Sequence, residues 1–251
     1  MNDESEFLFG INLINEVLLN RPEEIISLHI NPDKKNNRIE SVLDNAKTKD
    51  IPISTEDENF FINIDGSRNS DICIKCKVRK EEDEKFLESL LGKEQLLILI
   101  LDHLTDPHNV GACLRSAAAS GADAVIAPKN RSCHLTPTVR RVSSGGSELI
   151  PFVIVTNLAR TLKNLNKNGI DIIGTDLSSE SSYNEVKYQD KVAFVIGSED
   201  RGMKRLTKEN CNHIVNIPMK KQIDSLNASV TTGIILFEFR RQKSNKPNKI
   251  N

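Results

Sequence analysis

The 251-residue sequence has little of several features that would assign it quickly to a functional class. It contains no tryptophan, only 4% of its residues are aromatic, and its formal net charge is -1. A net charge this close to zero gives no overall attraction to nucleic acid, so any such binding must come from local basic clusters. The longest aliphatic run, residues 96–101, is far shorter than the roughly 20 residues that span a bilayer. The first residues, "MNDESEF", are acidic, whereas a signal peptide begins with basic residues. We therefore predict a cytoplasmic protein that does not contact a membrane.

Cysteines are few and irregularly spaced. The chain has five, an odd number, which predicts free thiols rather than a disulfide framework. Cys73 and Cys76 form the one close pair, in "DICIKCKV". Because apolar and polar residues alternate there as in a strand, the two cysteines should point to opposite faces. No second pair completes a zinc site, so we expect no metal.

Two patterns divide the chain. Within residues 1–78, "FGINLINEVLLN" has helical spacing, "IISLHI" and "DICIKCKV" resemble strands, and together they predict a small α/β domain. The charged run "RKEEDEK" indicates a linker, which we place at residues 79–94. In residues 95–251, aliphatic strands such as "LLILILD" and "VAFVIG" alternate with helices. This alternation predicts a parallel sheet covered on both faces.

The stretch "TDPHNVGACLRSA" places Arg115 on a helix among small residues. Its helical neighbours at three and four positions are glycine or alanine. Such a surface either lets a ligand lie close to the backbone or packs closely against another helix, with Arg115 in an interhelical salt bridge. Asn109 follows a turn-forming Asp-Pro pair, and its default role is to cap that helix.

Two further stretches place polar residues after buried strands. In "VAFVIGSEDRGM" a strand leads into Gly197, Glu199 and Gly202, at the edge where open parallel sheets bind ligands. The spacing matches neither GxGxxG nor a P-loop. In "SLNAS", Ser225 and Asn227 are natural N-cap residues of a helix that starts near Ala228.

Together, in this order, the three stretches resemble the signature motifs of the SpoU (TrmH-like) family of RNA ribose 2′-O-methyltransferases, in the SPOUT class. "DPHNVGACLRSA", "AVIAPKNRS", "TNLARTL" and "SLNASVTTGIILFE" are most similar to bacterial members that methylate a guanosine in the peptidyl-transferase region of 23S rRNA. "FGINLINEVLL" resembles the ribosomal-protein-like RNA-binding domain of that subfamily. One departure is "SDICI", which stands where relatives usually carry His-Gln-Gly and which bears on RNA contacts there.

The resemblance implies a parallel α/β SPOUT domain whose C-terminal part forms a trefoil knot, an exception to ordinary chain topology. It implies S-adenosylmethionine as the cofactor, without a metal, and a homodimer that acts on 23S rRNA or on the assembling large ribosomal subunit. By motif position Gly197, Gly202, Ile217 and Leu226 would bind the cofactor, largely through backbone groups and apolar contacts.

The resemblance also implies the catalytic residues. Arg115 would act either as a base activated by an RNA phosphate or as a bidentate clamp on that phosphate that stabilises the forming alkoxide. The second role suits a guanidinium, whose pKa lies above about 12. Asn109, Glu199, Ser225 and Asn227 would orient ribose, cofactor or Arg115, and Glu199 as a direct base is the lesser alternative.

Three other functions compete with this interpretation. A relative within the family could act on tRNA, and a non-catalytic RNA-binding or ribosome-assembly protein could keep the fold without turnover. A nucleotide-binding oxidoreductase is disfavoured by the missing GxGxxG. If the chain binds RNA, the expected local basic clusters are the following: Lys34, Lys35 and Arg38 in the first domain, and Arg131, Arg140 and Arg141 in the second.

Overall fold

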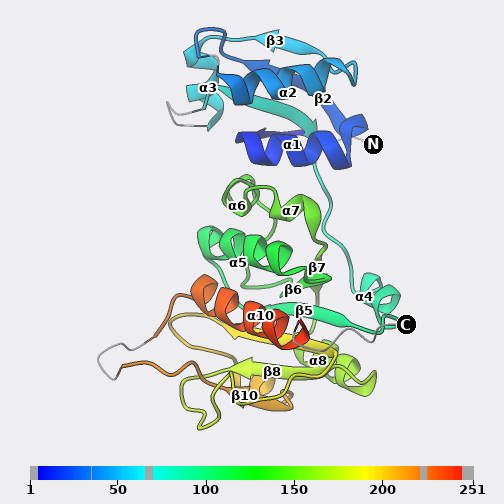
Figure 1. The fold of residues 1–251 in the computed structure, drawn as a ribbon, viewed down its shortest axis with the longest axis vertical. Coiled ribbons are helices and arrows are strands. Elements are labelled where there is room, and N and C mark those ends of the chain that lie inside the picture. The colour runs from blue at the N-terminus through cyan, green and yellow to red at the C-terminus, as the bar shows by residue number, and fades with distance from the viewer. Residues whose placement is uncertain (1–4, 35, 66–69, 221–224, 245–251) are drawn as a thin grey trace.

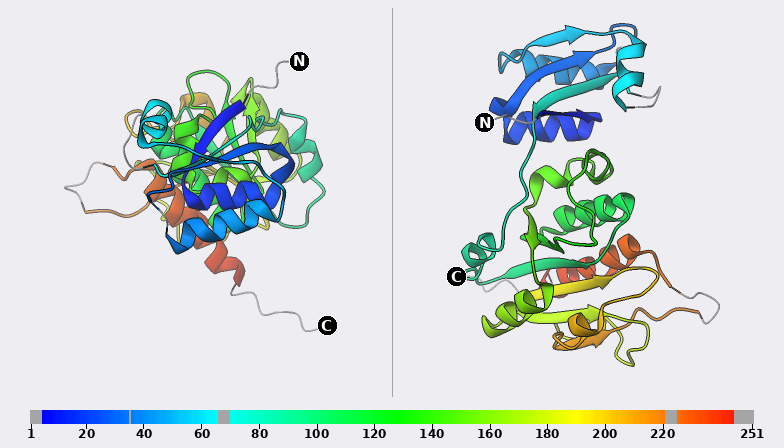
Figure 2. Two further views of the ribbon diagram at one scale, coloured as in Figure 1. Left: turned by 90° about the horizontal axis from the view of Figure 1, so that it is seen from above. Right: turned by 180° about the vertical axis from the view of Figure 1, so that it is seen from behind.

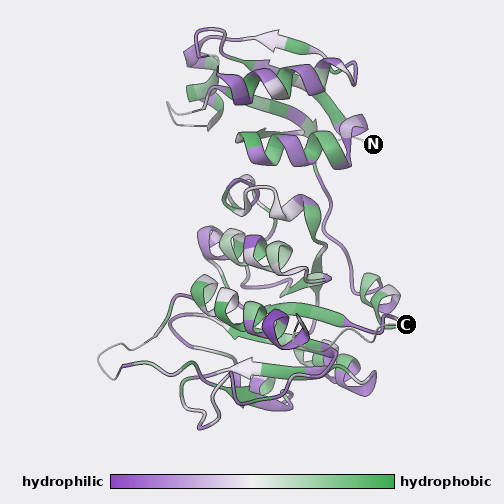
Figure 3. Cartoon of the chain, in the orientation of Figure 1, coloured by the Kyte–Doolittle hydropathy of each residue, from purple (hydrophilic) through white to green (hydrophobic). Residues whose placement is uncertain are grey.

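The computed structural model describes residues 5–34, 36–65, 70–220 and 225–244. A small N-terminal unit and a larger C-terminal unit lie one above the other, and a single extended segment connects their sheets (Figure 1). Hydrophobic residues are frequent in the strands of both sheets, whereas the helices carry both hydrophobic and hydrophilic residues (Figure 3).

The N-terminal unit is built on a four-stranded sheet with the order β1-β4-β2-β3. Strand β4 pairs antiparallel with both β1 and β2, and β2 pairs parallel with β3. The strands are β1 (Ser5–Phe9), β2 (Ile25–Ile30), β3 (Ile53–Thr55) and β4 (Ile72–Lys77). The helices are α1 (Ile11–Asn20), the 3-10 turn η1 (Pro22–Glu24), α2 (Asn37–Lys47) and α3 (Glu58–Asp65).

The sequence patterns of this unit have clear structural counterparts. The helical spacing in "INLINEVLLN" gives α1 a buried face of Leu13, Ile14, Val17 and Leu18. Cys73 and Cys76 are fully buried in separate apolar clusters, so they do point to opposite faces of β4. Five free cysteines are present in the part of the chain that the structure describes.

The C-terminal unit contains the predicted parallel sheet, with six strands in the order β10-β8-β9-β5-β6-β7. One apolar cluster packs this sheet against α5 and α10, and a second packs it against α4 and α8, so both faces are covered. The strands are β5 (Leu96–Asp102), β6 (Ala124–Pro128), β7 (Phe152–Val155), β8 (Asp171–Thr175), β9 (Lys191–Gly197) and β10 (His213–Val215). The helices are α4 (Phe86–Leu90), α5 (Pro107–Ser120), α6 (Pro137–Ser143), α7 (Gly146–Leu149), α8 (Leu158–Lys167), α9 (Arg205–Lys208) and α10 (Ala228–Ser244).

The strand order reverses at the centre of this sheet. The chain runs outward from β5 through β6 to β7, and then crosses to the other side of β5 to build β8, β9 and β10. Ligands of open parallel sheets bind at such a switch point, outside the carboxyl ends of the strands. None of the described helices is long and apolar enough to cross a membrane.

A buried ionic cluster joins the two units. The Glu148 side chain at the end of α7 is fully buried, and its carboxylate lies 2.8 Å from Arg21 of the N-terminal unit, 3.6 Å from Arg79 and 3.5 Å from Arg140. Arg140 also lies 3.3 Å from Glu6 of β1. Arg140 is fully buried, so it cannot contact RNA. Its inclusion among the predicted basic RNA contacts was therefore wrong.

Candidate active site

The first motif enters the site through helix α5. The N-cap of α5 is Asp106, whose carboxylate accepts hydrogen bonds from the backbone N–H groups of His108 and Asn109, and Pro107 is the first helical residue. The N-cap assignment of Asn109 was therefore wrong, because the Asp-Pro pair starts the helix itself. The Asn109 side chain is thus left to reach across to another segment.

A hydrogen-bonded cluster unites the three motifs. Glu199 Oε1 accepts from Asn109 Nδ2 at 3.0 Å, from Asn227 Nδ2 at 2.6 Å and from the backbone N–H of Ala228 at 3.0 Å. Asn227 Nδ2 also donates to Asn109 Oδ1 at 2.8 Å, while Asn227 Oδ1 accepts from the N–H of Ser229 at 2.9 Å. Asn227 thus caps α10 as expected, and Glu199 places a carboxylate at the same helix N-terminus, where the helix dipole favours negative charge.

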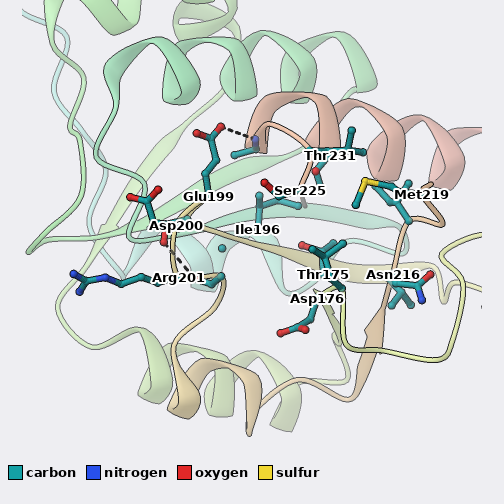
Figure 4. Close-up of a pocket in the computed structure, with 18 residues that line it drawn as sticks. Thr175, Asp176, Ile196, Glu199, Asp200, Arg201, Asn216, Met219, Ser225 and Thr231 are labelled. Atoms are coloured by element: carbon teal, nitrogen blue, oxygen red, sulfur yellow. Dashed lines mark hydrogen bonds between the residues drawn. The ribbon is translucent and has the colours of Figure 1, made fainter. Parts of the chain in front are cut away.

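A cavity of about 460 Å³ lies beside this cluster, at the carboxyl ends of β8, β9 and β10. Figure 4 shows Thr175 and Asp176 on one side of it and Glu199, Ser225 and Thr231 on the other. The four residues expected to bind a cofactor, together with Glu199 and Ser225, all line it. Those four are Gly197, Gly202, Ile217 and Leu226.

The two glycines of the second motif are required by the loop's own backbone. A Cβ atom on Gly197 would lie 2.2 Å from the carbonyl carbon of Gly202, and Gly202 itself has a φ of +62°. The loop closes with hydrogen bonds between Ser198 and Gly202 in both directions, at 3.2 and 2.8 Å. Glycine at 197 therefore lets the loop fold back on β9, and this tight turn presents Glu199 to α10.

Polar groups on the cavity wall can recognise a cationic or hydrogen-bonding ligand. Burial raises the pKa of Asp176, but hydrogen bonds from Lys208, at 2.8 Å, and from Ser178 outweigh it and hold the pKa below its ordinary value. Asp176 is therefore an anion at neutral pH. Asn216 also lines the cavity, and its Nδ2 donates to the backbone carbonyl of Ser179.

Arg115 stands apart from the cluster. Its side chain is exposed, and it forms no salt bridge or hydrogen bond with the described residues. The small residues around it are only partly open: a Cβ on Gly111 would lie 2.7 Å from Val142 of α6, and one on Gly146 would lie 3.0 Å from the Arg115 Cα. Helices α6 and α7 therefore pack closely on this part of α5, but without the interhelical salt bridge that close packing was expected to bring.

Three of the five expected catalytic residues, Asn109, Glu199 and Asn227, thus meet in one cluster. Ser225 lines the adjoining cavity. Within a single chain, Arg115 neither joins this cluster nor lines the cavity. Sequence reasoning missed the contribution of the end of β8 and of the residues that follow it, since Thr175, Asp176 and Leu177 line the cavity. The strand pattern of "DIIGTD" could have indicated it, because the ends of parallel strands meet at one sheet edge. The described residues hold no group of three or more side chains suited to a metal ion.

Family models match both units of the chain. The model of the SpoU rRNA Methylase family matches residues 96–237, and the model for RNA 2'-O ribose methyltransferase substrate binding matches residues 7–81.

Similar proteins span nearly the whole length. Enzymes named 23S rRNA (guanosine-2'-O-)-methyltransferase RlmB share 39% identity in Coxiella burnetii, covering 94% of this chain and 95% of the relative, and 42% in Neisseria meningitidis serogroup B, covering 97% and 98%. The Escherichia coli enzyme of the same name is 37% identical and covers 96% and 100%.

Solved structures agree on the fold. A crystal structure of an RNA 2'-O ribose methyltransferase superimposes with a TM-score of 0.80 at 23% identity, over 96% of this chain and 90% of that one. The SpoU methyltransferase AviRb from Streptomyces viridochromogenes, in complex with the cofactor AdoMet, gives 0.79 at 20% identity, over 96% and 91%.

Proposed function

This chain belongs to the SpoU rRNA methylase family, and from that premise we propose that it transfers a methyl group from S-adenosylmethionine to the ribose 2′-hydroxyl of a guanosine in 23S rRNA. The observation that carries the proposal is the meeting of all three motifs beside one cavity at the switch point of the parallel sheet. The full-length similarity to enzymes named for this reaction supports the choice of RNA.

The cavity suits S-adenosylmethionine, a ligand with a cationic sulfonium and a polar adenosine. Asp176 supplies an ionised carboxylate that is paired with Lys208, and Ile217 and Leu226 supply apolar surface. When bound, the cofactor supplies an electrophilic methyl group. The protein must then align the ribose with that methyl group and stabilise the charge that develops on the ribose oxygen.

We assign Glu199 a positioning role rather than that of a base. Its Oε1 already accepts three hydrogen bonds, which tie the cavity loop of residues 198–202 to α5 and to the first turn of α10. Asn109 and Asn227 complete this cluster through the hydrogen bond between their side chains. Ser225, on the cavity wall, remains available to orient the ribose or the cofactor.

Arg115 is proposed as the residue that holds the RNA at the reacting ribose. Its guanidinium is exposed and has no polar partner among the described residues, so it is available to a phosphate. A guanidinium stays protonated and forms a planar fork of donors, which suits a bidentate clamp on the phosphate next to a forming alkoxide.

We further propose that the active form is a homodimer. Val230 and Phe237 are 48% and 51% exposed on α10, and their spacing of seven positions places both on one face of that helix. Covering this face with a second copy would remove exposed apolar surface next to the cofactor cavity, which α10 also lines. Light scattering at micromolar concentration tests this, because a monomer near 28 kDa that still turns over would contradict it.

Several sequence-based expectations stay predictions. They are the division into residues 1–78, 79–94 and 95–251, the trefoil knot, the cytoplasmic location and the use of an assembling ribosomal particle as substrate. Residues 221–224, within the C-terminal part of the chain, lie outside the described residues.

The test of the main proposal is a methylation assay with the full chain, labelled S-adenosylmethionine, and either a 23S rRNA fragment from the peptidyl-transferase region or tRNA. We expect label in the 23S fragment and 2′-O-methylguanosine after nuclease digestion. Preferred methylation of tRNA would contradict the RNA assignment, and binding of NAD or ATP in place of S-adenosylmethionine would contradict the activity.

A further inference from the structure

A second cavity, of about 620 Å³, lies at the junction of the two units, away from the cofactor cavity. Its walls come from the start of α1, the start of α2 and the residues before β4 in the N-terminal unit, and from Arg141 and Ser144 at the end of α6 in the C-terminal unit. Figure 1 and the right-hand view of Figure 2 show α1 facing α6 and α7 across this junction. A cavity of this size accommodates a ligand as large as a nucleotide.

The lining of this junction cavity is basic. Arg38 and Arg141 both line it, and both are exposed, so one residue from each predicted basic cluster reaches the same place. Asp71 is the one acidic residue in the lining, and its carboxylate is already paired with Lys34 at 3.1 Å. Lys35 lies outside the described residues. The net charge near zero of the whole chain therefore conceals a local site for an anion.

Backbone donors add to this charge. Helix α1 begins after Gly10, no side chain among the described residues caps it, and its first turn, which lines the junction cavity, holds no acidic residue. The amide groups of that turn carry the positive end of the helix dipole toward the cavity. The floor is apolar, since Phe9, Leu13, Ile39 and Ile72 are buried. A charged rim over an apolar floor matches a ligand that has both an anionic group and a flat apolar part.

The cavity is preformed because the junction is held together independently of it. The ion pair of Glu148 with Arg21 and that of Arg140 with Glu6 fix α7 and α6 against the N-terminal unit. At the cavity itself, Asn12 accepts a hydrogen bond from Arg38 Nη2 at 2.9 Å and donates one to Ser144 Oγ at 3.0 Å. The Asn12 side chain therefore links Arg38 of the N-terminal unit to Ser144 of the C-terminal unit. A ligand bound here would contact both units in their fixed arrangement.

We propose that the junction cavity binds a phosphodiester and its adjoining base in the RNA substrate, at a nucleotide other than the one methylated. This inference rests on the proposed function. It assigns to the N-terminal unit the role of selecting which nucleotide of the RNA reaches the cofactor cavity. RNA gripped between the units is held at a set distance from the cofactor cavity, so that one ribose is presented for reaction. Unpaired nucleotides in loops supply both the phosphate and the splayed base that such a site needs.

The sharpest test is Asn12→Asp, which keeps the size of the side chain but places a negative charge in the junction cavity. An acid in the first turn stabilises a helix and can pair with Arg38, and the Ser144 hydroxyl can turn to donate to the new carboxylate in place of the bond that Asn12 gave it. The melting temperature should therefore stay level or rise. Affinity for the 23S fragment should nevertheless fall about tenfold, because a phosphate contact is a charge-assisted hydrogen bond. Binding of S-adenosylmethionine should not change.

A second variant, Arg38→Gln, removes the charge itself. We expect weaker RNA binding and a plot of log affinity against log salt whose slope is smaller by about one, as for the loss of one phosphate contact. Lys47→Gln is the matched control, because it removes one charge from the other end of α2 at an exposed residue that does not line the cavity. Its affinity and salt slope should equal those of the wild type.

The outcomes separate this inference from the proposed function. If the wild type methylates the 23S fragment but both cavity variants bind it with unchanged affinity and salt slope, the junction cavity is not an RNA site. If inorganic phosphate or GMP alone binds and loses affinity in the variants while RNA does not, the site belongs to a small anion and the inference is wrong. If the wild type neither binds nor methylates the fragment, the proposed function fails, and this assignment fails with it.

Discussion

Replacing Glu199 with alanine should weaken cofactor binding and stability together, because one carboxylate oxygen braces all three motifs. The change removes three hydrogen bonds, to Asn109, Asn227 and the N–H of Ala228. These groups are near the surface, so water can replace part of what is lost. The stability cost is then that of a lost helix cap, about 1 kcal/mol, plus about 0.5 kcal/mol for the dipole. For a chain of this size, about 1.5 kcal/mol lowers the melting temperature by roughly 3–6 °C.

The effect on S-adenosylmethionine binding follows from the two segments that the Glu199 hydrogen bonds hold together. Glu199 joins the loop of residues 198–202 to the start of α10, and both line the cofactor cavity. Without these hydrogen bonds, the ligand must use about 1.5 kcal/mol of its binding free energy to hold the loop and α10 in place. Calorimetry should therefore show an affinity for S-adenosylmethionine reduced about tenfold. Glu209→Ala is the control, since it removes an exposed carboxylate paired with Arg205 and should leave both quantities near the wild-type values.

A double-mutant cycle tests the reasoning directly. Glu199→Ala and Asn109→Ala each remove one end of the 3.0 Å hydrogen bond between α5 and the loop. Their effects on the free energy of unfolding should be non-additive, with a coupling of at least about 0.5 kcal/mol. Additive effects, or wild-type cofactor affinity in Glu199→Ala, would show that the cluster does not organise the cavity.

Four other outcomes are expected. Arg115→Lys should lose most methyltransferase activity while calorimetry shows near-normal S-adenosylmethionine binding, since lysine lacks the planar fork; wild-type turnover would refute the clamp. Leu226→Asp should weaken cofactor binding by placing a charge against an apolar wall, and an unchanged dissociation constant would show that Leu226 lies away from the ligand. Glu148→Ala should lower the free energy of unfolding by about 3–5 kcal/mol in denaturant titrations, because it removes the fully buried carboxylate that Arg21, Arg79 and Arg140 share and leaves their positive charge in excess. At pH 8, Cys113 should react with a disulfide reagent only after unfolding, because burial raises its pKa to about 12 and keeps it protonated, whereas the partly exposed Cys133 should react first.

The sequence by itself determined the elements with strong periodicity. The spacing in "INLINEVLLN" gave α1, the aliphatic runs gave β5 and β9, and the alternation of strands and helices gave a parallel sheet, because side-chain periods of 3.6 and 2 are local properties. It did not reveal β1, whose short run "SEFLF" adjoins the helix. The three motifs also led to the family and to six residues that line the cavity beside the cluster.

Only the tertiary structure decided which of those residues meet. Asn109 and Asn227 are separated by 118 positions, and Asn109 and Glu199 by 90, so no local pattern could place them on one carboxylate. The same holds for Arg140, which looks like a surface cation in sequence but is buried beside Glu6 and Glu148. Burial and pairing depend on how separate elements pack, and that packing also brings Arg38 and Arg141 to a single cavity between the units.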